Sequence, residues 1–523
     1  MNPRSFPMSR LGHIARAAAL AVVASTVISC DRSITQTEQL PSLMASSLDA
    51  SAGSWKMIVL SAPNQVAVPA PASVTSDAYK LELAAIRSAQ GAMTTAQRER
   101  IAFWSGGGVL RWNQVLRGLV ARYNLPPAPR ADGSYPVPDA SNPFADPAFP
   151  FANPPYAARA YSYVAVAQYE ALKAAWFYKF QYNRPSPAKV DADVRALMPV
   201  SELPAYPSED AVMAGASVAM LQALFPAAVE EITRRGADQR EAALLSGKAS
   251  SSDLAAGLAL GRAVAAQVLA RMSTDGTAAA IGTPALWAAL ADSARARGEI
   301  PWVSLDGPAR PPMLPNFGAV LSWNMTRGEV VAARPKAPFS TSSAEMQAEL
   351  AEVRRTVNGL TREQRAIALR WNDGAGTYAP PGHWNDIAAE YIRDAQFSEV
   401  RAARAFALLN MAMHDASVGC WEAKFRYFSP RPSQLDPSIR TEIGLPNFPA
   451  YPSGHSTFSA AAANVLGYLF PGAAPTFKAM SDQAGMSRMY GGIHFRNDIT
   501  EGSAHGDRIA AFTVRFGQGD RAP

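Results

Sequence analysis

The feature that most constrains the fold is a long internal repeat. The stretch AYPSEDAVMAGASVAMLQALFP begins at Ala205, and AYPSGHSTFSAAAANVLGYLFP begins 245 residues later at Ala450. The same offset relates Trp176 to Trp421. A constant offset over this length indicates a tandem duplication, in which each copy is a similar packing unit.

Both copies favour helix over strand. Residues 211–224 and 457–469 are rich in residues of high helix propensity, and their apolar positions recur at helical spacing. No run alternates with a period of two. We therefore predict an all-α protein built from two tandem helical bundles that arose by internal duplication.

We expect four segments along the chain. They are a signal peptide at residues 1–29, a polar tether at 30–60, a first helical bundle at 61–310 and a second bundle at 311–523. The proline-rich stretch at residues 307–317 marks the connection between the bundles.

The N-terminus has the pattern of an export signal. Three arginines precede an uncharged stretch at residues 17–29, which is too short to cross a bilayer. The sequence Val27-Ile28-Ser29-Cys30 resembles a bacterial lipobox, in which the cysteine is lipidated. We expect an exported, periplasmic protein anchored through Cys30; an ordinary cleaved signal is the alternative.

Charge and cysteine content narrow the possible partners. Removal of residues 1–29 takes away three arginines and no acid, so the formal net charge falls from +6 to +3, which does not favour nucleic acid as a partner. Only Cys420 remains besides Cys30, so we expect no internal disulfide.

After residue 30 no run of 18 apolar residues occurs, and membrane contact is expected only through the lipid anchor. The oligomeric state stays open.

Three clusters of chemically active residues lie in the second half, in a fixed order. They are Lys424 with Arg431, then Ser453, Gly454 and His455, then Arg488, His494 and Asp498.

Each cluster contains groups that can bind an oxyanion. Lys424, Arg431 and Arg488 supply positive charge, and a guanidinium can donate two parallel hydrogen bonds to adjacent oxygens. Ser453 stands where a helix N-cap belongs, and Gly454 would let an anion approach the backbone amides without a Cβ in the way.

His494 completes the predicted site. We expect it to open the last helix, with Asp498 four residues on along the same helical face, where its carboxylate can orient the imidazole.

Taken singly, these patterns are weak. A P-S-G-H sequence is most often a turn with a helix cap, a lysine and an arginine seven residues apart are usually solvated, and a histidine–aspartate pair is usually structural. Their occurrence together, in this order, indicates one oxyanion-binding active site.

The first half serves as an internal control. It keeps a lysine, Lys179, at the offset of 245, and Arg184 follows it at a shorter spacing, but both histidines and the arginine of the third cluster are missing. Glu209, Asp210, Ala243 and Ala249 stand opposite Gly454, His455, Arg488 and His494. We therefore predict that only the second bundle carries the active site.

The clusters resemble the motif set shared by vanadium-dependent haloperoxidases and type 2 phosphatidic acid phosphatases. Residues 448–455, FPAYPSGH, look like those of the vanadium chloroperoxidases, and Trp421 falls where that family has a tryptophan. Asp373 resembles the acid that supports the cations there, and Phe448 resembles the residue of chloride-oxidising members. His455 and Arg488 are 33 residues apart, which is closer than in the fungal chloroperoxidases and within the phosphatase range.

The resemblance implies a mechanism. In a haloperoxidase, vanadate would be bonded to His494 and neutralised by Lys424, Arg431, Ser453, Gly454 and Arg488. His455 would act as acid–base, and Lys424 would polarise hydrogen peroxide for attack by a halide. No haem or flavin is implied.

Two alternatives remain open. In an acid phosphatase acting on a small phosphate ester, without vanadate, His494 would attack phosphorus and His455 would protonate the leaving alcohol. A non-catalytic helical scaffold with a relict site is the third possibility.

Among the remaining histidines, we expect His414, beside Asp415, and His505 to be structural, and His383 to be an ordinary loop residue.

Overall fold

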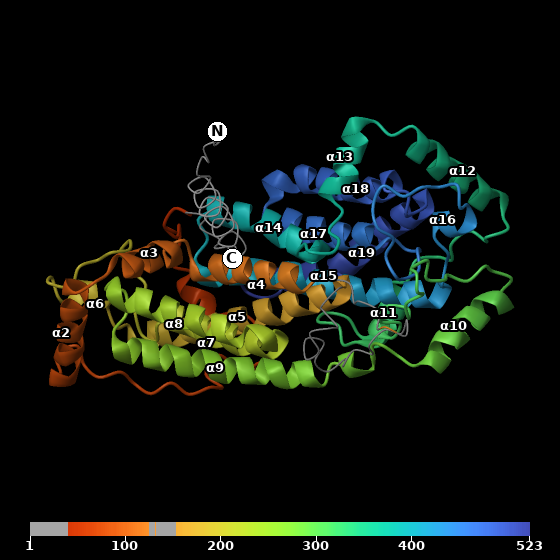
Figure 1. Cartoon of the computed structure of the whole chain (residues 1–523). Coiled ribbons are helices and arrows are strands. Elements are labelled where there is room, and N and C mark those ends of the chain that lie inside the picture. Colours follow the sequence, from red (N-terminus) through yellow and green to blue (C-terminus); the bar gives the residue numbers. More distant parts are fainter. Residues whose placement is uncertain (1–39, 125–130, 132–152) are drawn as a thin grey trace, which may run out of the picture. The chain divides into compact units, whose positions relative to one another are not determined.

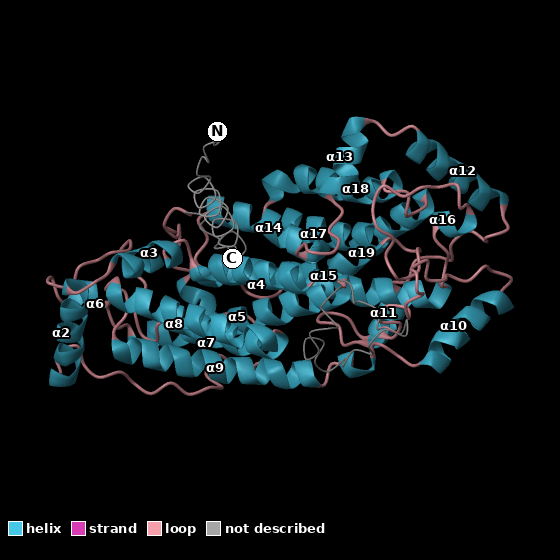
Figure 2. Ribbon diagram, viewed as in Figure 1, coloured by secondary structure: helices cyan, strands magenta, loops and turns pink. Residues whose placement is uncertain are grey.

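The computed structural model describes residues 40–124, 131 and 153–523. The expected signal peptide, Cys30 and the first part of the expected tether lie outside the described residues. Residues 41–523 form one compact unit. Throughout the described residues the regular elements are helices, with no strand (Figure 2), which confirms the all-α prediction.

The structure contains long α-helices and short single turns of helix. Up to residue 300 the α-helices are α2 (Asp77–Gly91), α3 (Thr95–Trp104), α4 (Gly108–Tyr123), α5 (Pro154–Tyr182), α6 (Pro187–Val190), α7 (Glu209–Leu224), α8 (Val229–Leu245), α9 (Ser251–Ser273) and α10 (Pro284–Ala296). Beyond it they are α11 (Arg327–Ala332), α12 (Ala344–Asn358), α13 (Arg362–Arg370), α14 (Ala379–Asp394), α15 (Glu399–Tyr427), α16 (Pro432–Leu435), α17 (Gly454–Leu469), α18 (Ala474–Tyr490) and α19 (Arg496–Gln518). The 3₁₀ turns are η1 (Ala50–Ser54), η2 (Pro226–Ala228), η3 (Thr277–Ala279), η4 (Phe317–Ala319) and η5 (Pro471–Ala473).

Helix lengths repeat between the two halves. Helices α5 and α15 each have 29 residues, α7 and α17 have 16, α8 and α18 have 17, and α9 and α19 have 23. Each second member begins 245 residues after the first. This repetition favours the predicted duplication, which remains an interpretation of the sequence and the helix bounds.

Helices α5 and α15 pack against each other at the centre of the compact unit (Figure 1). Both are buried along most of their length, as expected for helices that are apolar on every side. In the first half α7 and α9 pack against α5, and α8 packs against α7. In the second half α17 and α19 pack against α15, and α18 packs against α17. One hydrophobic core spans both halves, and the predicted boundary near residue 310 remains a prediction.

Residues 49–60, expected to belong to the tether, pack against α5. Ala52 and Trp55 are buried, and the backbone amides of Ile58, Val59 and Leu60 donate to the buried Glu170 carboxylate. The apolar side chains of this stretch explain why it is not a free linker.

One helical stretch among the described residues, 251–279, is long and apolar enough by composition to cross a membrane. It contains α9, which packs against α7 within the compact unit.

Candidate active site

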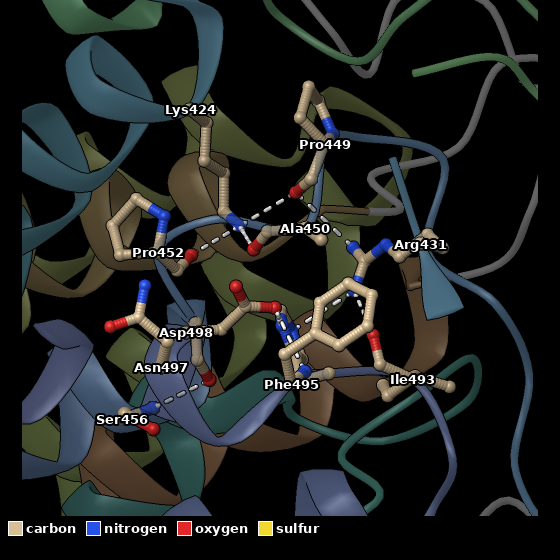
Figure 3. A network of polar contacts seen from close by, with 12 residues as sticks. Lys424, Arg431, Pro449, Ala450, Pro452, Ser456, Ile493, Phe495, Asn497 and Asp498 are labelled. Carbon is tan, nitrogen blue, oxygen red and sulfur yellow. Dashed lines mark hydrogen bonds and ion pairs between the residues drawn. The ribbon is translucent and has the colours of Figure 1, made fainter. Parts of the chain in front are cut away.

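Lys424 lies in the last turn of α15 and is fully buried. Its Nζ donates to the carbonyls of Pro449, Ala450 and Pro452, at 2.8, 2.8 and 2.6 Å (Figure 3). Burial lowers the pKa of Lys424, and the nearby Arg431 lowers it further. The loop before α17 therefore holds this cation through backbone dipoles rather than through a carboxylate.

Arg431, the residue before α16, lies in the same network. Its guanidinium donates to the carbonyls of Phe448 and Ile493, both at 2.9 Å, and to Nε2 of His494 at 3.0 Å. The Phe448 ring lies 5.1 Å from Arg431 Cζ and 5.1 Å from Lys424 Nζ, within the range of cation–π attraction. Burial lowers the pKa of Arg431 to about 9.

The N-terminus of α17 forms as the sequence predicts. Ser453 is its N-cap, and its hydroxyl accepts from the backbone amide of Ser456 at 3.3 Å. Gly454 is the first helical residue, and a Cβ there would lie no closer than 3.9 Å to any neighbour, with Lys424 Cε at 4.0 Å. Protein packing therefore does not require glycine at this position, and a side chain would enter the space beside Lys424.

His494 lies just before α19, because the helix begins at Arg496 and not at His494 as expected. The predicted pairing still forms: Nδ1 lies 2.9 Å from Asp498 Oδ2, which also accepts from the Phe495 amide. Burial, followed by the charges of Arg431, Lys424 and Arg488, lowers the pKa of His494 well below its ordinary value. The imidazole is therefore neutral, with its proton on Nδ1 and the lone pair of Nε2 facing Arg431.

Arg488 and His455 line the same cavity. Burial lowers the pKa of Arg488 to about 10, and burial together with Arg488 lowers the pKa of His455 to about 4. Arg488 donates to the Trp371 carbonyl. Nε2 of His455 lies 3.5 Å from Oδ2 of Asp373, which is long for a hydrogen bond, and has no other partner.

The cavity has a volume of about 450 Å³. Of the predicted site residues, seven line it: Asp373, Trp421, Phe448, Gly454, His455, Arg488 and His494. The other four, Lys424, Arg431, Ser453 and Asp498, are not part of its lining, and they contact the residues that line it or the loop before α17. The structure thus brings the three sequence clusters together at one place.

Several lining residues were missed by sequence reasoning. Arg310 and Met313 come from the proline-rich connection, and Asn124 and Asn153 come from the first half. The only available signal was the proline content of residues 307–317, which indicated an ordered connection but not its position. The Trp421 indole donates to the Met313 carbonyl at 3.1 Å, which ties this connection to α15.

The other histidines lie in different surroundings. His414 and His505 are fully buried and do not line the cavity. His383, expected in a loop, lies in the first turns of α14, where Nδ1 is 2.9 Å from Asp373 Oδ1.

Part of the second half matches a known family. Residues 403–521 match the model of the PAP2 superfamily, and this range contains every predicted site residue except Asp373. Residues 403–521 form a PAP2 superfamily domain. The PAP2 domain begins within α15 and ends just after α19.

One curated relative is the vanadium chloroperoxidase of Curvularia inaequalis. It is 30% identical over 147 residues, which are 22% of this chain and 24% of that protein. The match therefore spans about a quarter of the relative's length.

Solved structures resemble the chain over a longer range. A bacterial vanadium-dependent iodoperoxidase has a TM-score of 0.55 at 21% identity, over 78% of this chain and 95% of that one. The holo form of a bacterial vanadium-dependent chloroperoxidase has a TM-score of 0.50 at 12% identity, over 76% and 99%. The fold is therefore that of the vanadium-dependent haloperoxidases.

The residues around the PAP2-domain cavity fit a tetrahedral oxyanion. Lys424, Arg431 and Arg488 are buried cations, and among the described residues none of them forms an ion pair with an acid. Burial of unpaired charge is unfavourable, and an anion beside Gly454 would offset that cost. A neutral His494 with its lone pair on Nε2 adds a group that can bond to the central atom.

Proposed function

We propose that this protein is a vanadium-dependent haloperoxidase, which oxidises a halide with hydrogen peroxide at a vanadate bonded to His494. The observation that carries the proposal is the set of three buried cations without acidic partners beside the cavity of the PAP2 domain. The likeness of the fold to vanadium-dependent haloperoxidases supports it.

Different residues would bond the vanadate, bind its oxygens and neutralise its charge. His494 would bond the vanadate, Arg488 and the amides at the start of α17 would bind its oxygens, and the charges of Lys424 and Arg431 would neutralise it. Bound vanadate supplies a Lewis acid that activates hydrogen peroxide without a change in its own oxidation state.

The protein supplies orientation and proton transfer. Asp498 holds Nδ1 of His494, which keeps the proton off Nε2. Nε2 accepts from Arg431 at 3.0 Å in this structure, so a bond to vanadate would replace that hydrogen bond. Conversion of halide and hydrogen peroxide to hypohalous acid and water consumes one proton, and His455, on the cavity wall, is placed to deliver it. Its lowered pKa keeps His455 mostly neutral at pH 7, so that it can first accept a proton from hydrogen peroxide.

An acid phosphatase is the second candidate, favoured by the match to the PAP2 superfamily, which includes phosphatases. The same geometry would let His494 attack phosphorus while the cations stabilise the transition state and His455 protonates the leaving alcohol.

One experiment separates the candidates. Purified protein with vanadate, hydrogen peroxide and bromide is tested for halogenation of a phenolic dye, and protein without vanadate is given an aryl phosphate. We expect halogenation that requires vanadate. Turnover of the aryl phosphate alone would favour the phosphatase. Inactivity in both assays, with no vanadate binding by calorimetry, would favour the non-catalytic helical scaffold.

We also propose that the protein is exported and held at the periplasmic face by a lipid on Cys30, because the sequence before it has the lipobox pattern. Metabolic labelling with radioactive palmitate should label the wild-type protein and not Cys30→Ser.

A further inference from the structure

The carboxylate of Asp373 lies between two histidines from different helices. Nδ1 of His383, in α14, lies 2.9 Å from Oδ1, and Nε2 of His455, in α17, lies 3.5 Å from Oδ2. Each oxygen therefore faces one imidazole. His455 lines the cavity, whereas His383 does not.

The direction of the shorter hydrogen bond follows from charge. Burial would raise the pKa of Asp373, but the hydrogen bond from His383 and the nearby His455 imidazole hold this pKa well below its usual range. An ionised carboxylate can only accept, so Nδ1 of His383 carries the proton and donates.

The His383 ring is held in one orientation. It stacks on Trp371, with the ring centroids 4.3 Å apart and an interplanar angle of 23°, and it meets the edge of Tyr378 at 6.2 Å. The His383 side chain is 13% exposed. A ring fixed in this way can fix the carboxylate that it contacts.

The first half lacks this arrangement. Helix α4 contains Trp112-Asn113 and helix α14 contains Trp384-Asn385, so Arg111 stands in α4 where α14 has His383. The Arg111 guanidinium donates to the Phe103 carbonyl at 2.8 Å, and Asp210 stands opposite His455. His383 and His455 are thus both absent from the half whose cavity is filled.

We propose that His383 is a positioning residue for the active site. By fixing the Asp373 carboxylate, it turns Nε2 of the His455 imidazole toward Asp373 and leaves Nδ1 for proton transfer in the cavity. The effect on turnover rests on the proposed function, whereas the effect on His455 does not.

The first test needs no substrate. Protein with isotope-labelled histidines is examined by long-range ¹H–¹⁵N NMR, which distinguishes the two imidazole tautomers; the chain has only six histidines. We expect one His455 tautomer in the wild type, with the proton on Nε2. His383→Phe keeps the ring stack but loses the donor, and should give a mixture of tautomers. His383→Asn, whose amide can replace Nδ1, should restore the single form.

The second test measures turnover and vanadate affinity. In His383→Phe we expect a fall in turnover of roughly tenfold to a hundredfold with unchanged vanadate affinity by calorimetry, and recovery of most of the turnover in His383→Asn. Glu390→Gln, an exposed change on the same helix, is the control and should equal the wild type.

An unchanged His455 tautomer in His383→Phe would overturn the proposal, whatever the turnover. A shifted tautomer in a protein that neither binds vanadate nor turns over a substrate would instead support the positioning role and refute the proposed function. Thermal unfolding of each variant identifies a loss of activity that results from misfolding.

Discussion

Each half has a buried lysine at the same position of corresponding helices, Lys179 in α5 and Lys424 in α15, but different groups accept hydrogen bonds from the two ammonium groups. In the first half Nζ of Lys179 contacts the Pro204 carbonyl and Oε2 of Glu209, both at 2.6 Å. In the second half Lys424 contacts three carbonyls and no acid, because glycine stands at position 454, opposite Glu209.

The surroundings of the two lysines follow from this difference. Lys248 bridges Glu209 and Asp210 at 2.8 and 2.7 Å, so the first half contains its own anions. The cavity beside Glu209 has a volume of about 30 Å³, against about 450 Å³ beside Gly454. In the first half the Glu209 carboxylate occupies the space beside the buried lysine. In the second half the corresponding space beside Lys424 is part of the larger cavity, where we propose that an external oxyanion binds.

The largest effect should come from giving the second half the residue of the first at position 494. His494→Ala, which copies Ala249, removes the group that would bond vanadate. We expect loss of vanadate coordination and of either activity, measured by the ⁵¹V NMR signal of bound vanadate and by both assays. A variant that still halogenates would refute the assigned role.

Gly454→Glu should come next. The new carboxylate would enter the space beside Lys424 and occupy it as Glu209 does beside Lys179. We expect activity to fall by about a thousandfold, comparable to loss of a key oxyanion contact, with no loss of thermal stability. Calorimetry with vanadate gives the binding; tight binding in this variant would show that the two pockets are not equivalent.

Glu209→Gln in the first half should destabilise the fold without affecting the site. It leaves the buried Lys179 without its ion-pair partner, which costs about 3–5 kcal/mol of unfolding free energy. Gly454→Gln is the matched change in the second half and should cost much less, since it removes no ion pair.

The pH dependence of this variant provides a further check. Burial raises the pKa of Glu209, but Lys179 and Lys248 more than offset this and lower it overall. Its contribution to stability is therefore present above the unfolded pKa of about 4.3 and is lost as the pH falls. Chemical denaturation at about pH 6 and at about pH 3 should show a larger loss of unfolding free energy in the wild type than in Glu209→Gln, because the other carboxylates titrate in both proteins.

Vanadate should raise the unfolding free energy of the wild-type protein by less than Glu209→Gln lowers it. A ligand at about 100 times its dissociation constant adds about 2.7 kcal/mol to the unfolding free energy. We expect a rise in melting temperature with added vanadate, and none in Gly454→Glu. An equal rise in both would locate the binding outside the cavity.

The smallest effect is expected from Asp210→His. It restores the histidine opposite His455 but not the missing arginine or the second histidine, because Ala243 and Ala249 stand at those positions. In the His494→Ala background, no activity should return in either assay. Any recovered turnover would contradict the conclusion that the first half is only structural.

Much of this molecule was predictable because the chemistry is carried by short local patterns. The helix propensity of the repeated segments predicted the all-α fold. The N-cap at Ser453 and the pairing of His494 with Asp498 depend on residues three or four apart, and both formed as predicted. Even so, His494 precedes α19 rather than opening it, since the exact start of a helix depends on capping contacts that spacing alone does not specify.

The sequence by itself determined the fold class, the order of the clusters and the absence of both histidines and of the third cation from the first half. Only the tertiary structure decided which groups face the cavity. It directed Lys424 and Arg431 toward backbone carbonyls, brought Arg310 to the cavity wall from the connection between the halves, and placed His383 against Asp373. Such contacts join residues far apart in the chain, so they depend on how the helices pack and leave no local pattern in the sequence.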